Sequence, residues 1–388
     1  MNALDDTDPL ARFHERFLQT PDVAAYLDGN SLGRPLTTTA ARLTEFVEQQ
    51  WGARLIRGWS EGWLEQGQRI GDDLGRVALG AAAGQTSIGD STTVLLYKLV
   101  RAAADARPGR TELVIDRDNF PTDRYLIEGI AAERGLTVRW IEPGDVTVDR
   151  IPLGPQTAVV VLSHVAYRSG FLADVPAITD AVHAAGALVV WDLCHSAGVI
   201  PTHLDDWGVD LAVGCTYKYL NGGPGSPAFA YVRAELQGEL RQPIQGWLGS
   251  ADPFAMGQGY APAEGIRGFL SGTPPVIGML AMQGMIALIE EAGLDAVRAK
   301  SIALTEYAIE LADDLLRDAA LSSPRDAARR GAHVTLDHPS FEGIMPALWE
   351  RGVIPDFRRP TGIRLGLSPL STSFAEVELG VRTIAELV

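Results

Sequence analysis

The spacing of hydrophobic and polar residues divides most of the chain into alternating helices and short strands. Apolar residues recur with helical spacing over 37–55, 62–80, 92–104 and 175–185. Short apolar runs, typical of buried strands, occupy 112–115, 138–141, 158–162, 187–191, 211–214 and 228–232. This alternation predicts an α/β fold whose large domain holds a mostly parallel sheet with helices on both faces.

A second, smaller α/β unit is predicted towards the carboxyl end. Helical spacing covers 275–316, and a βαβ-like unit follows at 333–336, 342–351, 362–367 and 374–387. We expect the amino-terminal segment to join this unit. The expected division is therefore a large domain of residues 50–285 and a small domain formed by residues 1–49 together with 286–388.

Composition narrows the class of protein. A chain of 388 residues is long enough to bury a large core, and its net charge of −16 argues against nucleic acid or an anionic membrane as partner. No apolar run reaches the length of a membrane span, and residues 1–12 carry acids where a targeting segment would be basic. Cys194 and Cys215 are too few for a disulfide framework or a zinc site, so we expect two small buried side chains and no metal. A cytoplasmic protein that acts on a small molecule is expected.

Lysine is rare in this chain. It occurs three times among 33 basic residues, which leaves thirty arginines. Lys98 and Lys300 lie in stretches with helical spacing and are interpreted as surface cations, whereas Lys218 lies in the segment GCTYKYLNGGPG at 214–225. Arginine cannot replace lysine where an amine must lose its proton and attack a carbonyl. Lys218 therefore predicts a Schiff base, whose natural partner is pyridoxal phosphate.

Polar residues follow two consecutive predicted strands. Asp192 comes directly after the run 187–191, with His195 three residues on, and Lys218 follows the next run. Ligands of an open parallel sheet bind beyond the carboxyl ends of its strands, so Asp192 and Lys218 can face one ligand. There the Asp192 carboxylate would keep a pyridine nitrogen protonated. The alternative is an aspartate that caps the next turn.

Two further segments suit a phosphorylated, planar ligand. Residues 89–93, GDSTT, open a strong helical run, and amides at a helix start bind phosphate, although an ordinary Ser/Thr cap gives the same pattern. In the segment DNFPTD at 118–123, Phe120 could lie against a planar ring. A plain turn followed by a helix with Pro121 at its first position is the alternative there.

Five segments together resemble the kynureninase family, particularly its bacterial members. They are YLDGNSLG at 26–33, DNFPTDRY at 118–125, DLCHSAG at 192–198, the Lys218 segment at 214–225, and GIR at 362–364. The resemblance implies an aspartate-aminotransferase-like fold (PLP fold type I) and a homodimer with its active site at the subunit interface. It also implies hydrolysis of L-kynurenine or L-3-hydroxykynurenine to anthranilate or 3-hydroxyanthranilate plus L-alanine, in tryptophan catabolism by the kynurenine pathway and its branch to NAD biosynthesis.

The same resemblance implies a role for individual residues. Lys218 would be the Schiff-base lysine, Asp192 the partner of the pyridine nitrogen, and Tyr217 a proton donor to the substrate carbanion. Arg364 would grip the substrate α-carboxylate with its planar fork, assisted by Ser31. An inward-facing strand residue in a salt bridge is the alternative for Arg364. The implied cofactor contacts are Thr92, Thr93, Phe120, Pro121, Thr122, Asp123, Ser163, Asp192, His195, Tyr217 and Lys218, with Trp247 and Thr273 reaching the phosphate from the neighbouring subunit.

The chain departs from the family pattern beside Trp247. Leu248 stands where an aromatic residue is usual, Ser250 where a histidine is usual, and Ala166 where many members carry asparagine. A smaller side chain leaves room, and a hydroxyl can bond a polar ring substituent. We therefore hypothesise that 3-hydroxykynurenine is accepted at least as well as kynurenine. Neutral drift compensated elsewhere in the pocket is the alternative.

Other functions of the same fold stay open at this point. A cysteine-desulfurase-like lyase would need a mobile nucleophilic cysteine. An aminotransferase would convert a keto acid without releasing anthranilate, and a non-catalytic binding protein would not retain the cofactor. The sequence does not identify the base that activates the hydrolytic water.

Overall fold

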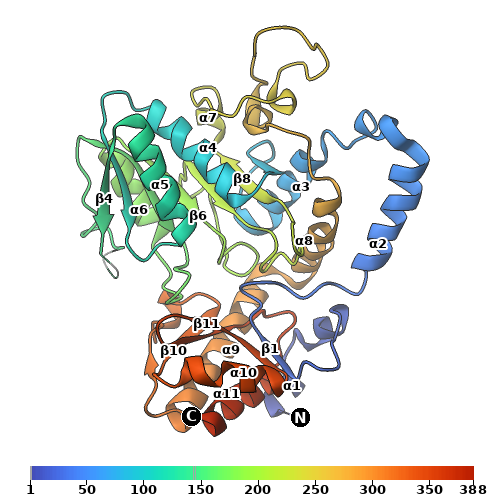
Figure 1. The fold of residues 1–388 in the computed structure, drawn as a ribbon, viewed down its shortest axis with the longest axis vertical. Coiled ribbons are helices and arrows are strands. Elements are labelled where there is room, and N and C mark those ends of the chain that lie inside the picture. Colours follow the sequence, from blue (N-terminus) through green and yellow to red (C-terminus); the bar gives the residue numbers. More distant parts are fainter. Residues whose placement is uncertain (1, 143, 145) are drawn as a thin grey trace.

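A computed structural model describes residues 2–142, 144 and 146–388, in which a seven-stranded sheet forms the upper part of the molecule and a smaller sheet the lower part (Figure 1). The strands of the large sheet, in spatial order, are β2 (Thr86–Gly89), β8 (Ala228–Val232), β7 (Leu211–Gly214), β6 (Leu188–Asp192), β5 (Thr157–Ser163), β3 (Glu112–Asp116) and β4 (Thr137–Ile141). Only β8 runs against its two neighbours, and the pairs from β7 to β4 are parallel. The mostly parallel sheet is confirmed.

The central strands of this sheet are buried on both faces, which explains their continuous apolar sequences. Val159 and Val161 of β5 pack in one cluster with α4 and α5, whereas Val160 and Leu162 pack in another with α6 and α8. Because successive side chains of a strand point to opposite faces, a strand between two helical layers must be apolar throughout. The helices of this part are α3 (Gln66–Leu74), α4 (Thr92–Asp105), α5 (Pro121–Arg134), α6 (Val175–Ala184), α7 (Ala234–Gln237) and α8 (Leu280–Ala292).

The small sheet combines both ends of the chain. Its spatial order is β1 (Ala25–Leu27), β11 (Val353–Arg358), β12 (Gly362–Gly366), β10 (His333–Asp337) and β9 (Ala320–Leu321). It is covered by α9 (Leu294–Leu315), α10 (Phe341–Glu350) and α11 (Phe374–Leu387), and the short α1 (Ala3–Asp6) lies at the amino end. β1 pairs in parallel with β11, so the amino-terminal segment contributes a strand here. The expected domain bounds stay a prediction.

The expected βαβ-like unit is wrong in detail. β11 was not anticipated, because Pro355, Asp356 and Arg358 interrupt its apolar pattern. β12 lies between β11 and β10 and is antiparallel to both, so the strand at 362–366 does not close a parallel crossover with the strand at 333–337.

The long helical stretch expected at 275–316 is two helices. α8 ends at Gly293, which has a φ of +80°, a conformation that glycine adopts without strain. Within the described residues no single helix is long and apolar enough to cross a membrane. One pair of helices, 277–292 and 294–315, has the required length and composition together, but it is bent by 88° at this glycine.

The helix expected at 37–55 lies at the edge of the molecule, where its Arg42 donates to the Leu280 carbonyl of α8 and Phe46 packs on Leu280. α2 (Thr39–Glu45) continues into wider helical turns at Phe46–Gly52 and tighter turns at Leu55–Trp59, and Figure 1 shows this segment on the right of the molecule. Likewise, the helix expected at 62–80 is α3 followed by wide turns at Gly75–Leu79.

The interpretation of Lys98 and Lys300 as surface cations is wrong. Lys98 is 0% exposed, and its Nζ donates to the Asp90 carboxylate at 2.5 Å and to the Phe269 carbonyl at 3.0 Å. Lys300 is also buried and pairs with Asp8 at 2.6 Å. A buried charge is tolerated only when it is paired. Helical spacing identifies the face on which a residue lies but not whether another element covers that face.

Candidate active site

A cavity of about 170 Å³ lies beyond the carboxyl ends of β6 and β7, at the start of α4. Many of the predicted cofactor residues meet there, although they come from four separate parts of the sequence. Its lining is Ser91, Thr92, Thr93, Phe120, Thr122, Asp123, Asp192, Cys194, His195, Tyr217 and Lys218.

Lys218 and Asp192 face this cavity together. β6 ends at Asp192 and pairs in parallel with β7, and Lys218 follows β7 by four residues. The Nζ atom of Lys218 is 3.0 Å from Nε2 of His195, and within the described part of the chain no carboxylate reaches it as an ion-pair partner. Both other lysines have one. Lys218 thus differs from the other two lysines: its amine lies in a cavity, contacts an imidazole and has no carboxylate partner among the described residues.

The loop that carries Lys218 is held by the amino-terminal segment. The Gly33 amide donates to the Tyr217 carbonyl at 2.9 Å, and the Asn221 side chain donates to the Arg34 carbonyl at 2.7 Å. A Cβ atom at Gly33 would lie 2.4 Å from the Lys218 carbonyl, so only glycine permits this approach. The segment at 26–33 is therefore part of the site.

Asp123 and Asp192 form a pair of buried carboxyl groups. Burial, and next the charge of Asp192, raise the pKa of Asp123 well above its usual range, while Lys218 opposes the shift. This shift favours the protonated form of Asp123, which can donate to Asp192, and Oδ1 of Asp192 accepts the Cys194 amide at 2.8 Å. A proton shared by the two carboxyl groups would leave one negative charge beside the position predicted for the pyridine nitrogen.

The start of α4 has the features of a phosphate cradle. Ser91 caps the helix by accepting the Val94 amide at 3.4 Å, and the first backbone bond of the helix is from Leu95 to Ser91. The amides of Thr92 and Thr93 precede that bond, so they remain available to a ligand. Tyr217 lies on the same cavity, and burial raises the pKa of its hydroxyl, which keeps the proton in place. These donors fit the phosphate of pyridoxal phosphate.

Phe120 is held at the edge of the cavity by two contacts. Its amide donates to Oδ1 of Asn119 at 2.7 Å, and the Tyr167 ring packs edge-on against its ring with centroids 5.4 Å apart. Pro121 begins α5, as the alternative interpretation of this segment anticipated. Ser163 does not line the cavity; its hydroxyl donates to Asn119 at 3.0 Å and so acts on the Phe120 loop. Asn119 was missed, although its position inside the DNFPTD segment could have marked it.

Arg364 and Ser31 meet although 333 residues separate them. Nη2 of Arg364 donates to the Ser31 hydroxyl at 2.7 Å and pairs with Asp356 at 2.8 Å. Nη1 donates to the Tyr167 carbonyl at 2.6 Å, whereas Nε is buried and has no partner among the described groups. The salt-bridge alternative is thus present, and the unpartnered Nε leaves capacity for a carboxylate. Burial and Asp356 raise the pKa of nearby Asp28 to about 6, although Ser31 and Arg364 lower it.

Trp247 and Thr273 do not line this cavity. The Trp247 ring packs against Trp59 and Phe254, with centroids 6.3 Å and 6.1 Å away. Thr273 lines a separate small cavity that also includes Leu248. Leu248 is 3% exposed and therefore packs inside its own subunit, whereas Ser250 is only partly buried. The structure thus gives Leu248 a packing role and leaves Ser250 as the residue beside Trp247 that could face a ligand.

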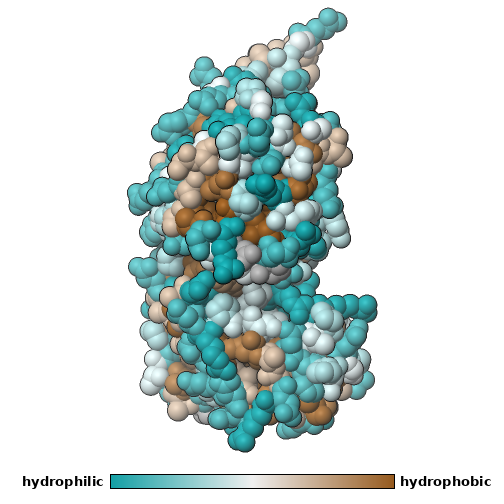
Figure 2. Space-filling view, turned by 90° about the vertical axis from the view of Figure 1, so that its left-hand side faces the viewer, coloured by the Kyte–Doolittle hydropathy of each residue, from teal (hydrophilic) through white to brown (hydrophobic). Residues whose placement is uncertain are grey.

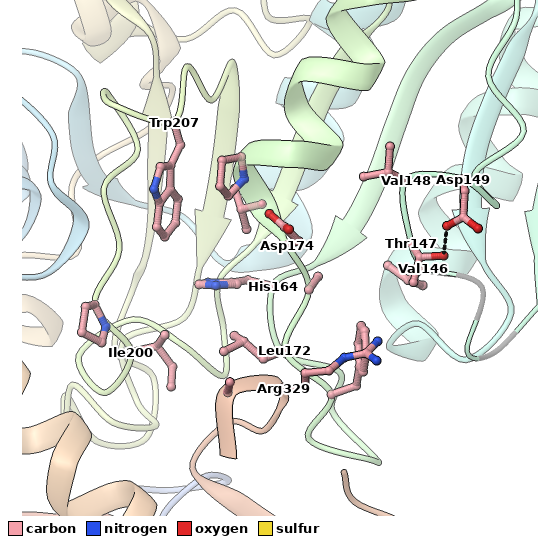
Figure 3. A pocket seen from close by; sticks show the side chains of 16 residues that line it. Val146, Thr147, Val148, Asp149, His164, Leu172, Asp174, Ile200, Trp207 and Arg329 are labelled. Carbon is pink, nitrogen blue, oxygen red and sulfur yellow. Dashed lines mark hydrogen bonds between the residues drawn. The ribbon is translucent and has the colours of Figure 1, made fainter. Parts of the chain in front are cut away.

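A larger cavity of about 600 Å³ lies elsewhere (Figure 3). His164 projects into it from the end of β5, edge-on to Trp207 with ring centroids 5.9 Å apart, and Arg329 lies on the opposite wall. Burial lowers the pKa of His164 to about 3, so this ring is neutral. Figure 2 shows apolar surface gathered midway down the side of the molecule on which β4 and α6 lie. This cavity lies apart from the lysine and the carboxyl pair, so the chemistry belongs to the smaller one.

Comparison with known proteins settles the family. Residues 297–384 match the family model described as the kynureninase C-terminal domain. The chain is 39% identical over 397 residues to a kynureninase of Pseudomonas fluorescens, an alignment that covers 100% of this chain and 94% of the relative. The chain belongs to the kynureninase family.

Solved structures agree on the fold. An apo cysteine desulfurase from Thermococcus onnurineus NA1 superimposes with a TM-score of 0.83 at 19% identity, over 97% of this chain and 98% of that one. A variant of the lyase C-DES, with glycine covalently linked to its PLP cofactor, gives 0.81 at 17% identity over 94% and 97%. At such identities the likeness concerns the fold, and the fold type I architecture expected for a kynureninase is confirmed.

The cysteine-desulfurase alternative finds no support in the cysteines. Cys194 and Cys215 are both free and buried, and the Cys215 amide donates to the Cys194 sulfur at 3.2 Å. Their surroundings, which include the other sulfur, raise the pKa of Cys194 and lower that of Cys215. A desulfurase nucleophile must reach a bound substrate from a mobile segment. Both thiols of this chain are instead buried, Cys194 in the wall of the cavity and Cys215 in contact with it.

We predict that Arg364→Lys raises KM for kynurenine roughly tenfold to a hundredfold, because lysine keeps the charge but loses the fork that can bind a carboxylate with two parallel bonds. Steady-state kinetics check this, with the visible absorption of the bound cofactor expected to stay normal. Arg298→Lys is a matched control, since Arg298 donates only to backbone carbonyls and its replacement should leave KM unchanged. Loss of cofactor with an unaltered KM would show that Arg364 does not bind the substrate.

Proposed function

We propose that this chain hydrolyses the Cβ–Cγ bond of L-kynurenine, and of its 3-hydroxy form, to an anthranilate and L-alanine in tryptophan catabolism. The observation that carries the proposal is the meeting of three groups on one cavity: the Lys218 amine, the Asp192 carboxylate and the free amides of α4. Family membership supplies the reaction. A cytoplasmic location stays a prediction.

Pyridoxal phosphate, when bound, supplies the electron sink for cleavage of bonds at Cα and Cβ. Lys218 would hold its aldehyde carbon, and Thr92 and Thr93 its phosphate. The Asp192 carboxylate would hold the proton on the pyridine nitrogen, and protonated Asp123 keeps a single charge at that position. The buried, donor-rich lining supports this cofactor.

The remaining work belongs to side chains of this chain. Arg364 and Ser31 would fix the substrate α-carboxylate and so place Cα near Lys218, whose amine removes the α-proton. Tyr217 keeps its hydroxyl proton because burial raises the pKa, so it can protonate the Cβ carbanion left by cleavage. Tyr167 links the two ends of the proposed site: its carbonyl accepts from Arg364, which would bind the substrate carboxylate, and its ring packs against Phe120.

Mixing the protein with pyridoxal phosphate and L-kynurenine tests the proposal, with anthranilate fluorescence as the readout. Release of anthranilate without added keto acid separates hydrolysis from transamination. Parallel reactions with L-cysteine, followed by sulfide release, test the desulfurase alternative. A protein that binds the cofactor and releases no anthranilate from kynurenine or its 3-hydroxy form would contradict the proposed function.

We also propose that the chain works as a homodimer with Trp247 and Thr273 directed at the partner's site. Both lie off the cavity of their own subunit. Exposed apolar side chains gather on residues 46–59 and on the loop after Trp247. On the surface of a monomer, exposed hydrophobic residues are usually scattered singly. They are Val47, Trp51, Leu55, Ile56, Phe254 and Met256.

This surface yields a prediction for the oligomeric state. Trp51→Glu is expected to shift the mass measured by light scattering from dimer towards monomer, because it buries a charge in an apolar interface. Trp349→Glu is the matched control: Trp349 of α10 is 60% exposed, against 51% for Trp51, and lies away from the surface in question. An unchanged mass for Trp51→Glu at low micromolar protein would contradict this interface.

The substrate ring yields a second prediction. Ser250→His is expected to change the ratio of kcat/KM for 3-hydroxykynurenine and kynurenine by roughly tenfold, since a pocket change of this size is worth about 1–3 kcal/mol. Leu248→Phe should instead lower stability with little change in that ratio, because Leu248 is buried in its own subunit and a larger ring overpacks it. Equal ratios in wild type and Ser250→His would show that residue 250 does not contact the ring.

A further inference from the structure

His333 is a buried imidazole that the proposed mechanism does not use. It is the first residue of β10 in the small sheet, is 0% exposed, and lies against Gly170, where an added Cβ would come within 3.3 Å of its Nε2. No hydrogen bond of standard geometry reaches either ring nitrogen among the described groups, although the Ala166 carbonyl lies near enough to act on the pKa of the ring. Buried polar atoms are nearly always satisfied, so an imidazole with two unsatisfied nitrogens needs an explanation.

The nearest ring to His333 belongs to the cofactor cavity. The centroids of His333 and His195 are 5.5 Å apart and the rings are inclined by 59°. Nδ1 of His195 also has no partner among the described groups, while Nε2 of the same ring is 3.0 Å from the Lys218 amine. Two buried imidazoles, each with an unsatisfied nitrogen, are therefore neighbours, and one of them contacts Lys218.

The charges around the two rings keep both neutral. Burial, and then the cations Lys218 and Arg364, lower the pKa of His195 well below its usual range. Burial, Arg364 and Lys218 do the same to His333, while the Ala166 carbonyl opposes the shift. Arg358 adds to the effect on both, and His333 to that on His195, while the Lys218 charge also acts on Asp123, which lines the same cavity as Asp192. A neutral imidazole has one donor and one acceptor nitrogen.

The contact with Lys218 decides which nitrogen of His195 is the donor. A protonated nitrogen at Lys218, either the ammonium or the Schiff-base nitrogen of the cofactor-loaded protein, can only donate, so Nε2 then accepts and the His195 proton sits on Nδ1. That proton then needs an acceptor, and two hydrogen bonds of about 2.8 Å through one water span the gap to a neighbouring ring. The second nitrogen of His333 is left to donate towards the Ala166 carbonyl, which already accepts the Gly170 amide at 2.9 Å.

We propose that His333 is a positioning residue: through a buried water it accepts the Nδ1 proton of His195 and so keeps the Nε2 lone pair directed at Lys218. The relay runs from Lys218 through His195 and His333 to Ala166, with each group donating in the same direction. It links the small sheet to the cofactor cavity. This inference deepens the proposed function and rests on it for the role of Lys218.

The first test reads the tautomer in cofactor-loaded, full-length protein without substrate. Nitrogen-15 NMR of labelled histidine rings, with His195 identified by comparison with His195→Gln, should show a neutral His195 ring protonated on Nδ1. Because no substrate is present, this result stands or falls independently of kynurenine hydrolysis. A His195 ring protonated on Nε2 in the wild-type protein would overturn the proposal.

The second test uses paired variants of His333. His333→Phe removes the acceptor, so His195 should lose its single tautomer. The Nε2 lone pair would then no longer stabilise a proton at the Lys218 nitrogen, so the pH midpoint of the cofactor's visible absorption should fall by about one unit. We expect kcat to fall by about tenfold or more. The loss should stay below the ~10⁴-fold loss seen when a catalytic triad loses tautomer control. His333→Gln keeps an acceptor oxygen and should restore the tautomer, the midpoint and most of the activity.

His164→Phe is the matched control, because His164 is likewise buried with an unpartnered Nδ1 but lines the larger cavity. It should leave the His195 shifts and the absorption midpoint unchanged. If His333→Phe also leaves both at wild-type values, His333 only fills space and the proposal is wrong. Should His333→Phe fail to fold, the wild-type tautomer decides the matter, and His333→Gln, which keeps an acceptor, should leave both readouts at wild-type values; a shift of both in His333→Gln would contradict the proposal.

Discussion

Lys218→Ala is expected to lower kcat for kynurenine by about 10²- to 10⁴-fold, the usual range for removal of a positioned general base. The physical reason is that Lys218 faces the cavity without a carboxylate partner, whereas Lys98 and Lys300 are neutralised by ion pairs in the core. Stopped-flow and steady-state assays of anthranilate release measure the loss. The variant should still bind pyridoxal phosphate, since the amides of α4 remain.

A chemical experiment separates the three lysines. Borohydride treatment of the yellow protein should fix the cofactor on Lys218, as peptide mapping by mass spectrometry would show. Lys300→Arg retains a cation beside Asp8 and is expected to keep normal kcat and normal labelling. Label on Lys98 or Lys300 would overturn the assignment of Lys218.

Much of the large domain could be predicted because its strands are buried on both faces. The run Leu188–Trp191 of β6, for example, is apolar throughout, and the helices between such strands have regular spacing. β1 and β11 escaped prediction for a physical reason: β1 has three residues, and β11 carries Pro355 and Asp356. Their pairing comes from tertiary packing between the two ends of the chain, which no local pattern records.

The site was predictable where its residues follow strand ends in sequence order. Asp192 and Lys218 follow adjacent parallel strands, so their shared cavity follows from topology. The contact of Arg364 with Ser31 spans 333 residues and came from the family resemblance alone. His333 gave no signal, because an alternating strand pattern shows that a side chain is buried without showing which group it meets.

The two carboxyl groups of the cavity lead to the second large effect. Burial, and next the charge of Asp192, raise the pKa of Asp123, so a proton shared by the pair is expected on Asp123. A neutral asparagine closely imitates a protonated aspartic acid in shape and charge, whereas it removes the charge of a carboxylate. Replacements of the two residues by asparagine should therefore differ sharply.

Asp192→Asn is expected to lower kcat by at least about 10²-fold, the effect of removing a preorganised electrostatic stabiliser, because the pyridine nitrogen loses the carboxylate that holds its proton. Asp123→Asn should cost less than about tenfold, since the asparagine amide can still donate to Asp192. Both variants would be compared by kcat and by the cofactor's absorption spectrum between pH 6 and 9. Asp116→Asn is the control, because this buried carboxyl, whose pKa burial raises to about 6, does not line the cavity. Equal losses in Asp123→Asn and Asp192→Asn would mean that Asp123 also carries charge. Near-normal activity in Asp192→Asn would mean that the Asp192 carboxylate serves only to accept the Cys194 amide.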